Sequence, residues 1–183
     1  MTERGATADR RTRARGPLSR AAHEVCRAWR RMHRRWSGSG IAAVYHDSYE
    51  KTLDVVPLDP RRATKILAFL TEEGLFEPDD LSIARAPAMR AMLRVHDPDY
   101  LESLQRHDVV ERIFGAALTD NELEKVVDMQ RFAVGGTIQA TRLALRNRGV
   151  AINLGGGLHH AMRSSGMGFC VFNDVAVAVA RLR

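Results

Sequence analysis

The residues best suited to chemistry lie together near the end of the chain, in the segment GGGLHHAMRSSGMGFCVFND (155–174). This segment contains two adjacent histidines, His159 and His160, and the thiol of Cys170. Histidines transfer protons near neutral pH and bind metals, and a cysteine beside a histidine can act as a nucleophile. Adjacent side chains on a strand point to opposite faces, so both histidines reach one site only if the loop is irregular.

Three interpretations of this segment stay open on the residues alone. The three glycines could form a phosphate loop, but neither Gly-Lys-Ser/Thr nor Gly-x-Gly-x-x-Gly is present. The histidines could be a metal pair, although adjacent histidines are more often structural or surface residues. Cys170 could be a nucleophile, yet its neighbours Phe169 and Val171 indicate a packed side chain.

The elements that must position this segment follow from hydrophobic periodicity. Strands are predicted over 41–46 and 149–154, and helices over 60–76, 97–107 and 121–147. Segment 88–96 indicates a helix and a short strand, and 173–183 favours a helix capped by Asn173 or Asp174. The order predicts an α/β fold whose open, mostly parallel sheet is flanked by helices, with ligands at the carboxyl ends of its strands. Gly135-Gly136 inside a helical pattern indicates close approach of another backbone segment.

Positive charge is concentrated at the start of the chain. The 183 residues carry a formal charge of +6, but residues 1–36 hold eleven arginines against three acidic residues. Residues 37–183 hold 17 basic and 19 acidic side chains, which argues against a nucleic-acid-binding domain as a whole. We predict an Arg-rich tail over 1–40, disordered or partly helical, with a helix over 18–36 and Ser19 as its N-cap. Residues 1–36 could contact nucleic acid or an acidic partner, and a solvated arm is the simpler alternative.

Cysteine usage and apolar runs bear on the cellular compartment. Cys26 and Cys170 lack metal-binding spacing and favour a reducing, cytoplasmic setting. No apolar run reaches the roughly 18 residues of a transmembrane segment. The Arg-rich, acid-poor start is also compatible with a mitochondrial transit peptide.

Segment 155–174 resembles the histone deacetylase family, including its bacterial acetoin-utilisation and acetylpolyamine amidohydrolase relatives. The similar residues are Gly-Gly-Leu-His-His, followed by Gly-Phe-Cys and Asn-Asp. Weaker similarities occur upstream in the family's order, in VYHDSYE (44–50), PRRATKILAFLTEEGL (60–75), RVHDPDYLESL (94–104) and AVGGTIQA (133–140). The resemblance covers 41–183 and implies an arginase/deacetylase-like fold.

The resemblance also implies roles for individual residues. In that family a zinc or iron ion polarises an acyl-amide carbonyl and activates water, and two histidines handle protons. His160 matches the general base and acid, and His159 its electrostatic helper. The remaining matches are Gly168 and Phe169 with the acyl-lysine channel, Asp120 with the rim aspartate that holds substrate, and Arg62 with the arginine of an internal cavity.

The sequence departs from the family pattern in its metal ligands. No Asp-x-His motif occurs in the 183 residues, and the late transition-state tyrosine has no match. We therefore expect 41–183 to be the N-terminal half of a deacetylase-like catalytic domain, with an incomplete fold and no metal bound by this chain alone. The predicted function is zinc-type hydrolysis of acyl-lysine or acylpolyamine amides, inactive in this chain by itself. The alternative is a truncated, non-catalytic relative whose basic arm binds nucleic acid or an acidic partner.

Overall fold

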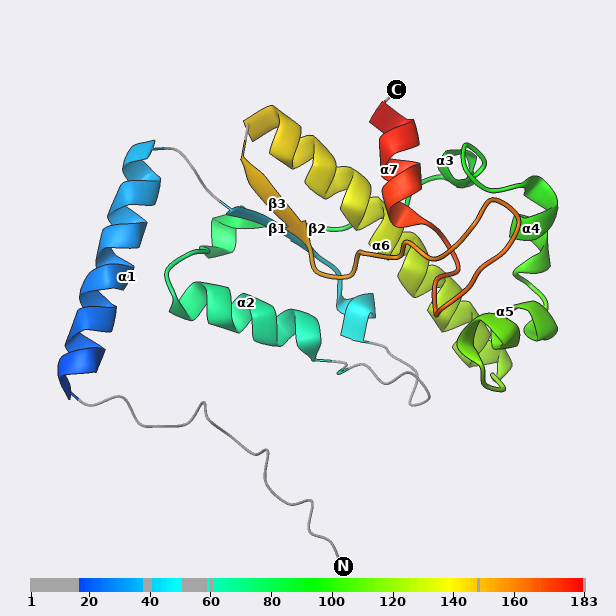
Figure 1. Ribbon diagram of the computed structural model, residues 1–183, viewed down its shortest axis with the longest axis horizontal. Helices are drawn as coiled ribbons and strands as arrows, with labels where there is room; N and C mark the ends of the chain where they lie inside the picture. Colours follow the sequence, from blue (N-terminus) through cyan, green and yellow to red (C-terminus); the bar gives the residue numbers. More distant parts are fainter. Residues whose placement is uncertain (1–16, 38–40, 51–58, 60, 148, 183) are drawn as a thin grey trace, which may run out of the picture.

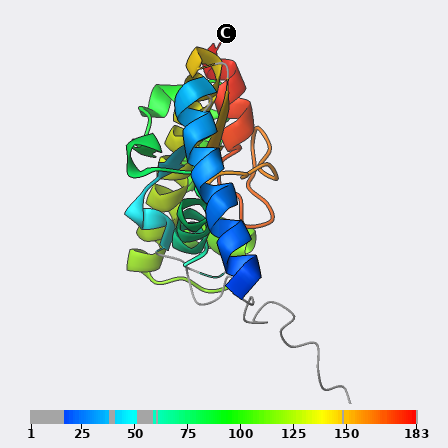
Figure 2. The same cartoon turned by 90° about the vertical axis from the view of Figure 1, so that its left-hand side faces the viewer.

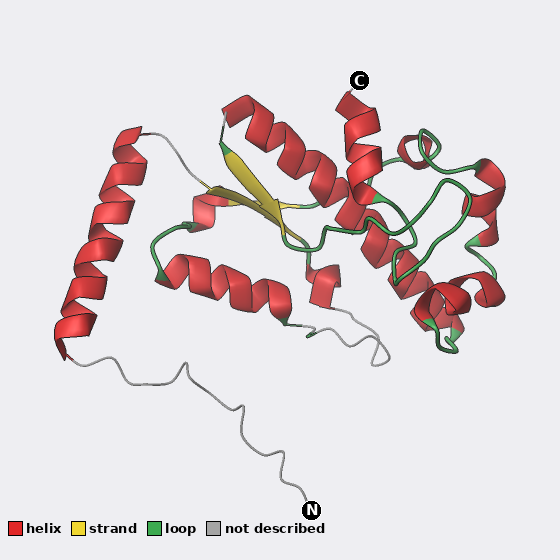
Figure 3. Cartoon of the chain, viewed as in Figure 1, coloured by secondary structure: helices red, strands yellow, loops and turns green. Residues whose placement is uncertain are grey.

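The computed structural model describes residues 17–37, 41–50, 59, 61–147 and 149–182, in which helices surround one small sheet (Figures 1 and 3). The strands are β1 (Ile41–Tyr45), β2 (Leu81–Ile83) and β3 (Val150–Asn153). The α-helices are α1 (Pro17–Ser37), α2 (Arg62–Glu72), α3 (Met89–Met92), α4 (Pro98–Ser103), α5 (His107–Phe114), α6 (Asp120–Asn147) and α7 (Asp174–Leu182). Two 3-10 helices are η1 (Asp47–Glu50) and η2 (Pro78–Asp80).

The sheet is parallel, with the strand order β2-β1-β3. Val44 of the central strand is fully buried and lies opposite Ser82 on one side and Asn153 on the other. Parallel neighbours need crossover connections, and these include α2 between β1 and β2 and α6 before β3. Figure 1 shows α2 and α6 on opposite sides of the sheet, as right-handed crossovers in opposite directions require. The predicted α/β class and parallel sheet are confirmed.

The long helix α6 organises the interior. One apolar cluster packs α6 against α3, α4, α5 and α7, and a second packs it against β1 and Tyr49. A Cβ atom at Gly135 would overlap the backbone carbonyl of Arg85, and one at Gly136 would overlap Tyr49 and Asn153. The predicted close approach at the glycine pair is therefore confirmed, because the chain after β2 crosses directly over α6.

Helix α1 lies across one end of the molecule (Figure 2). It confirms the helix predicted over 18–36, but it begins at Pro17, so Ser19 is inside the helix instead of at its N-cap. His23 and Arg30 each lie 2.8 Å from a carboxylate oxygen of Glu73, just after α2. Hydrogen bonds with the His23 and Arg30 side chains lower the pKa of Glu73.

Three large apolar side chains of α1 point away from this contact. They are between 58% and 69% exposed: Val25, Trp29 and Met32. Charged residues face Glu73 because the carboxylate offers acceptors there. The expected disorder of residues 1–16 lies outside the described residues, and contact of the arm with nucleic acid or an acidic partner stays a prediction. Among the described helices, none is both long and apolar enough to cross a membrane.

Besides the N-cap of α1, one prediction of local structure is wrong, and two elements, β2 and α5, were missed. After α3, the backbone amides of Val95 and His96 donate to the carbonyl of Met92, so a helical turn stands where a short strand was expected. Strand β2 is only three residues long, too short for an alternating pattern. Helix α5 lies almost entirely between the helices predicted over 97–107 and 121–147, where no element was predicted. The capping prediction for α7 is confirmed, since Asn173 Oδ1 accepts a hydrogen bond from the Ala176 amide at 2.9 Å.

Candidate functional site

A cavity of about 330 Å³, here called the histidine cavity, opens beside the loop that follows β3. Its described walls come from η1, α2, α5, the first half of α6 and that loop. Five of the six predicted site residues line it: Arg62, His159, His160, Gly168 and Phe169. The structure thus brings together residues that are about one hundred positions apart in the sequence.

Gly168 and Phe169 occupy a tight turn. Met167 and Cys170 exchange both backbone hydrogen bonds, at 3.1 and 2.9 Å. The two central residues have φ angles of +56° and +65°. Positive φ at both positions is the geometry of a type I′ turn, which asparagine and glycine normally occupy. Phe169 is therefore a strained residue, and its ring is placed at the cavity by a backbone conformation that phenylalanine rarely adopts.

Three contacts hold Phe169 in this conformation. Gln130 Nε2 donates to its carbonyl at 2.6 Å, and its own amide donates to the carbonyl of Ile113 at 3.2 Å. Its ring meets Phe114 edge-on, with centroids 6.0 Å apart. Gln130 is buried, and its Oε1 also accepts from the Val171 amide at 2.7 Å. Sequence reasoning missed Gln130, although a polar residue on the apolar face of a helical pattern is a usable signal.

The two histidine rings lie beside each other. Their centroids are 4.1 Å apart, and both residues are exposed at the cavity. His159 Nδ1 lies 2.9 Å from the carbonyl of Gly157, so a proton on Nδ1 leaves Nε2 available. A Cβ atom on Gly168 would lie 3.2 Å from the His160 ring, so glycine lets the turn approach that ring. The loop is irregular here, as convergence of adjacent histidines requires.

Asp174 anchors the start of the loop between β3 and α7 (154–173), here called the histidine loop. Its side chain is fully buried, and Oδ2 accepts hydrogen bonds from the Gly157 amide at 2.9 Å and from the Thr137 hydroxyl. Its own amide donates to the carbonyl of Leu158 at 3.1 Å. Asp174 is also the first residue of α7. The carboxylate therefore joins α6, α7 and the residues just before the histidines.

His96 and Asn173 anchor the rest of the loop. Asn173 Nδ2 donates to the carbonyls of His159 and Ala161 at 3.1 and 3.0 Å. The Asn173 amide donates to His96 Nε2 at 3.1 Å, and His96 Nδ1 lies 2.8 Å from the carbonyl of Met162. These partners fit a neutral imidazole with its proton on Nδ1. Burial disfavours the charged ring and lowers the pKa of His96.

Cys170 has the environment of a structural thiol. It is buried, and burial raises its pKa above the ordinary value of a thiol. A reactive cysteine needs an exposed, electropositive setting that lowers its pKa. The structure therefore favours the packed interpretation of Cys170 over the nucleophilic one.

Arg62 and Asp120 differ in their placement. Arg62 is an exposed residue that lines the histidine cavity from the first turn of α2. Asp120 lies at the start of α6, fully exposed, and is absent from the described lining of that cavity. Its Oδ1 accepts from His107 Nε2 at 2.7 Å, and this contact raises the pKa of His107.

A metal site is not formed by the described residues alone. Within 17–37, 41–50, 59, 61–147 and 149–182, no three or more of the histidine, cysteine, aspartate and glutamate side chains are grouped to hold an ion. Zinc sites in proteins use three or four such ligands. The described residues therefore do not fit a zinc ion by themselves.

The histone deacetylase domain family matches residues 56–183 of this chain. The chain belongs to the histone deacetylase family. Histone deacetylase 2 of Arabidopsis thaliana is 33% identical over 150 residues, which cover 77% of this chain and 38% of that protein. The acetoin utilization protein AcuC of Staphylococcus aureus is 27% identical over 154 residues, covering 79% of this chain and 40% of that protein.

A solved structure supports the same fold. The crystal structure of an HDAC homolog from Aquifex aeolicus matches with a TM-score of 0.63 and 25% identity, covering 79% of this chain and 41% of that one. The small parallel sheet flanked by helices is thus part of the arginase/deacetylase-like fold that the sequence predicted. The chain spans about two fifths of the length of these three proteins.

Proposed function

We propose that the histidine cavity receives the acylated side chain of acyl-lysine or an acylpolyamine, and that His159 and His160 move protons during hydrolysis of its amide. The convergence of both histidines with Gly168 and Phe169 on one cavity of a deacetylase-family chain carries this proposal. We further propose that residues 41–183 are the N-terminal half of the catalytic domain and that residues 1–40 are an Arg-rich tail. Free thiols at Cys26 and Cys170 support a cytoplasmic setting.

The histidines supply the proton transfers that amide hydrolysis needs. Water must lose a proton to attack the carbonyl, and the poor amine leaving group must gain one. Neither ring nitrogen of His160 has a hydrogen-bond partner among the described residues, so His160 is free to act as base and then acid. His159 is oriented by Gly157 and stabilises the charge that develops on its neighbour.

The turn at 167–170 supplies the channel. The Phe169 ring, supported by Phe114, offers an apolar wall for the methylene stem of an acyl-lysine. Gly168 keeps the passage beside the His160 ring open. Arg62, at the cavity wall, keeps its proposed role as the arginine of an internal cavity. Asp120 keeps its proposed role as the rim aspartate, and it can contact only a substrate that extends beyond the histidine cavity.

Binding of an acetylated peptide tests the channel. A fluorescent peptide with one Nε-acetyl-lysine should bind the 183-residue chain saturably, and its unmodified-lysine counterpart should bind at least tenfold more weakly. Phe169→Ala should weaken acetyl-peptide binding about tenfold, since it removes the wall. Phe69→Ala, at an exposed phenylalanine of α2, is the matched control and should change nothing. Equal binding of both peptides, or equal loss in both variants, would reject the channel.

The family resemblance implies zinc or iron for the intact domain, and we place its ligands outside the described residues. After incubation with equimolar zinc and gel filtration, the 183-residue chain should retain far less than one zinc per chain. It should also show no zinc-dependent hydrolysis of the acetylated peptide. One tightly retained zinc per chain would show that this chain holds the metal itself.

A further inference from the structure

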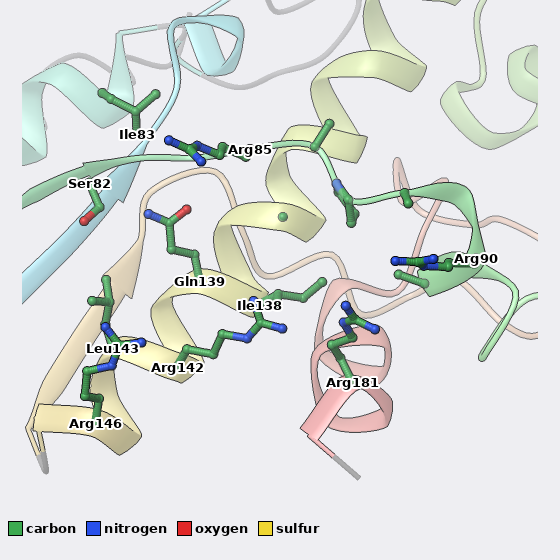
Figure 4. Close-up of a pocket in the computed structure, with 15 residues that line it drawn as sticks. Ser82, Ile83, Arg85, Arg90, Ile138, Gln139, Arg142, Leu143, Arg146 and Arg181 are labelled. Atoms are coloured by element: carbon green, nitrogen blue, oxygen red, sulfur yellow. The ribbon is translucent and has the colours of Figure 1, made fainter.

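A second cavity, of about 750 Å³, lies on the other half of α6 and is lined by arginines (Figure 4). We call it the arginine cavity. Its guanidinium groups come from three parts of the chain, the segment from β2 to α3, the end of α6, and the end of α7: Arg85, Arg90, Arg142, Arg146 and Arg181. It shares no described lining residue with the histidine cavity.

These arginines lack the carboxylate partners that other arginines have. No aspartate or glutamate is among the described lining residues, and none of the five guanidinium groups forms an ion pair or hydrogen bond with a described residue. Elsewhere in the described chain, six arginines pair with carboxylates: Arg27, Arg30, Arg106, Arg112, Arg131 and Arg163. Other described arginines, among them Arg20, Arg31 and Arg62, also lack an ion pair with a described carboxylate, but these three are spread over α1 and α2, whereas the five above line one cavity.

Helix stability accounts for only part of the cluster. A cation in the last turn of α6, such as Arg146, interacts favourably with the helix dipole. Arg142 and Arg146 nevertheless stand four positions apart, where like charges destabilise a helix. Arg85 and Arg90 come from outside the helix, and the crossing at Gly135 fixes the segment that carries them. Their shared cavity concentrates positive potential that an anion would relieve.

The floor of the arginine cavity is apolar. Ile138 is buried beneath it, and Pro87, Ala91 and Leu143 are among the apolar lining residues, while Ser82 and Gln139 add two uncharged polar side chains. Guanidinium groups bind phosphate oxygens in pairs of parallel hydrogen bonds, and several together select for more than one phosphate. A volume of this size with an apolar floor accommodates an organic group as well as the phosphates.

We propose that the arginine cavity is a binding site for a small organic phosphate that carries two or three phosphate groups. The phosphates bind the guanidinium groups at the walls, and the organic part packs on Ile138 and Leu143. This site is separate from the proposed deacylase chemistry and does not depend on it.

Calorimetric titration of the 183-residue chain with ADP, inorganic pyrophosphate and adenosine tests this site. ADP should bind more tightly than pyrophosphate, adenosine should not bind measurably, and the ADP affinity should fall as salt rises. Absence of ADP binding, or equal binding of adenosine, would overturn the proposal. The proposal would also be overturned if a DNA oligonucleotide bound more tightly than ADP and the arginine substitutions described below abolished its binding, because the surface would then be a nucleic-acid site.

Paired substitutions locate the binding. The double variant Arg142→Ala/Arg181→Ala should lose at least tenfold in ADP affinity, and Arg142→Lys/Arg181→Lys should lose less, because it keeps charge but not paired hydrogen bonds. The control, Arg106→Ala/Arg112→Ala, removes the same charge from exposed positions at α5, outside the described lining of the arginine cavity, and should bind ADP as the wild type does. Equal losses in test and control would show unspecific attraction and overturn the site.

Discussion

The histidine cavity and the arginine cavity are built on the same helix in different ways. Gln130 of α6 forms hydrogen bonds with Phe169 and Val171 of the loop, and Thr137 of α6 donates to Asp174 at the start of α7, so hydrogen bonds fix the segment beside the histidine cavity. Towards the end of α6, Arg142 and Arg146 line an open cavity and have no ion-pair partner among the residues that the structure describes. A site for proton transfer needs side chains held in place, whereas a site for a polyanion needs only concentrated charge.

The largest difference should appear on removing the Asp174 carboxylate. Asp174→Ala leaves the Gly157 amide and the Thr137 hydroxyl without their acceptor, at a cost of about 2–3 kcal/mol in the free energy of unfolding. Acetyl-peptide binding should be lost, and ADP binding below the melting temperature should persist. Urea unfolding and both titrations measure this.

Asp128 provides the control for that substitution. Its carboxylate is half exposed and pairs with Arg131 within α6, so Asp128→Ala should change stability by less than about 1 kcal/mol. Two results would contradict this account: an equal loss in the free energy of unfolding for Asp128→Ala and Asp174→Ala, or a loss of ADP binding in Asp174→Ala. Either would show that the buried carboxylate does not stabilise the histidine loop specifically.

A pH series of the free energy of unfolding is the next test. His96, which anchors the loop at the histidine cavity, can titrate near neutral pH, whereas the arginines of the arginine cavity cannot. The pKa of buried His96 is lowered, so the unfolded chain binds its proton first as pH falls. The free energy of unfolding should therefore decrease below about pH 6.5, by at most about 1.4 kcal/mol per pH unit for this one proton. His96→Gln should reduce that slope, as measured by urea unfolding between pH 5 and 8.

His107 gives the opposite sign. Asp120 raises its pKa, so its contribution is present below about pH 6.5 and is lost as pH rises through the raised value. His107→Gln should therefore remove the gain in stability that this group gives as pH falls through the raised value towards about pH 6.5. A wild-type chain equally stable at pH 5 and pH 7, with no change of slope in His96→Gln, would contradict the neutral, anchoring histidine.

The smallest effect concerns the backbone at Phe169. Because φ is +65° there, Phe169→Gly should be more stable than Phe169→Ala by about 1 kcal/mol. At Phe69, inside α2, the same pair should show the reverse order by about the same amount. Thermal melts of the four variants measure both differences. An alanine variant at 169 as stable as the glycine variant would show that the turn carries no strain.

Much of the fold follows from local pattern. Long periodic segments such as 121–147, and the apolar run before Gly155, specify α6 and β3 because each buries one face. Gly135 was informative because only a close crossing requires glycine within a helix. Strand β2 was not predictable from the sequence. It has only three residues, and these are extended because they pair with β1, not because of their own sequence pattern.

The site was predictable in its residues but not in its supports. His159, His160, Gly168 and Phe169 lie in one short segment, so their proximity needed no knowledge of the fold. Gln130 and His96 act on that segment from 39 and 77 positions away in sequence, and only tertiary structure places them. The arginine cavity was equally hidden, because its charges are scattered from 85 to 181.

A two-ligand NMR titration of the 183-residue chain tests the central claim that the histidine cavity receives an acylated lysine. The acetyl-lysine peptide should shift the backbone amides of Gly157, Gly168 and Phe169, and ADP added to the same sample should shift those of Arg85, Gln139 and Arg142 without displacing the peptide. If the acetylated peptide leaves the first set unmoved, or shifts both sets alike, the histidine cavity is not the acyl-lysine site.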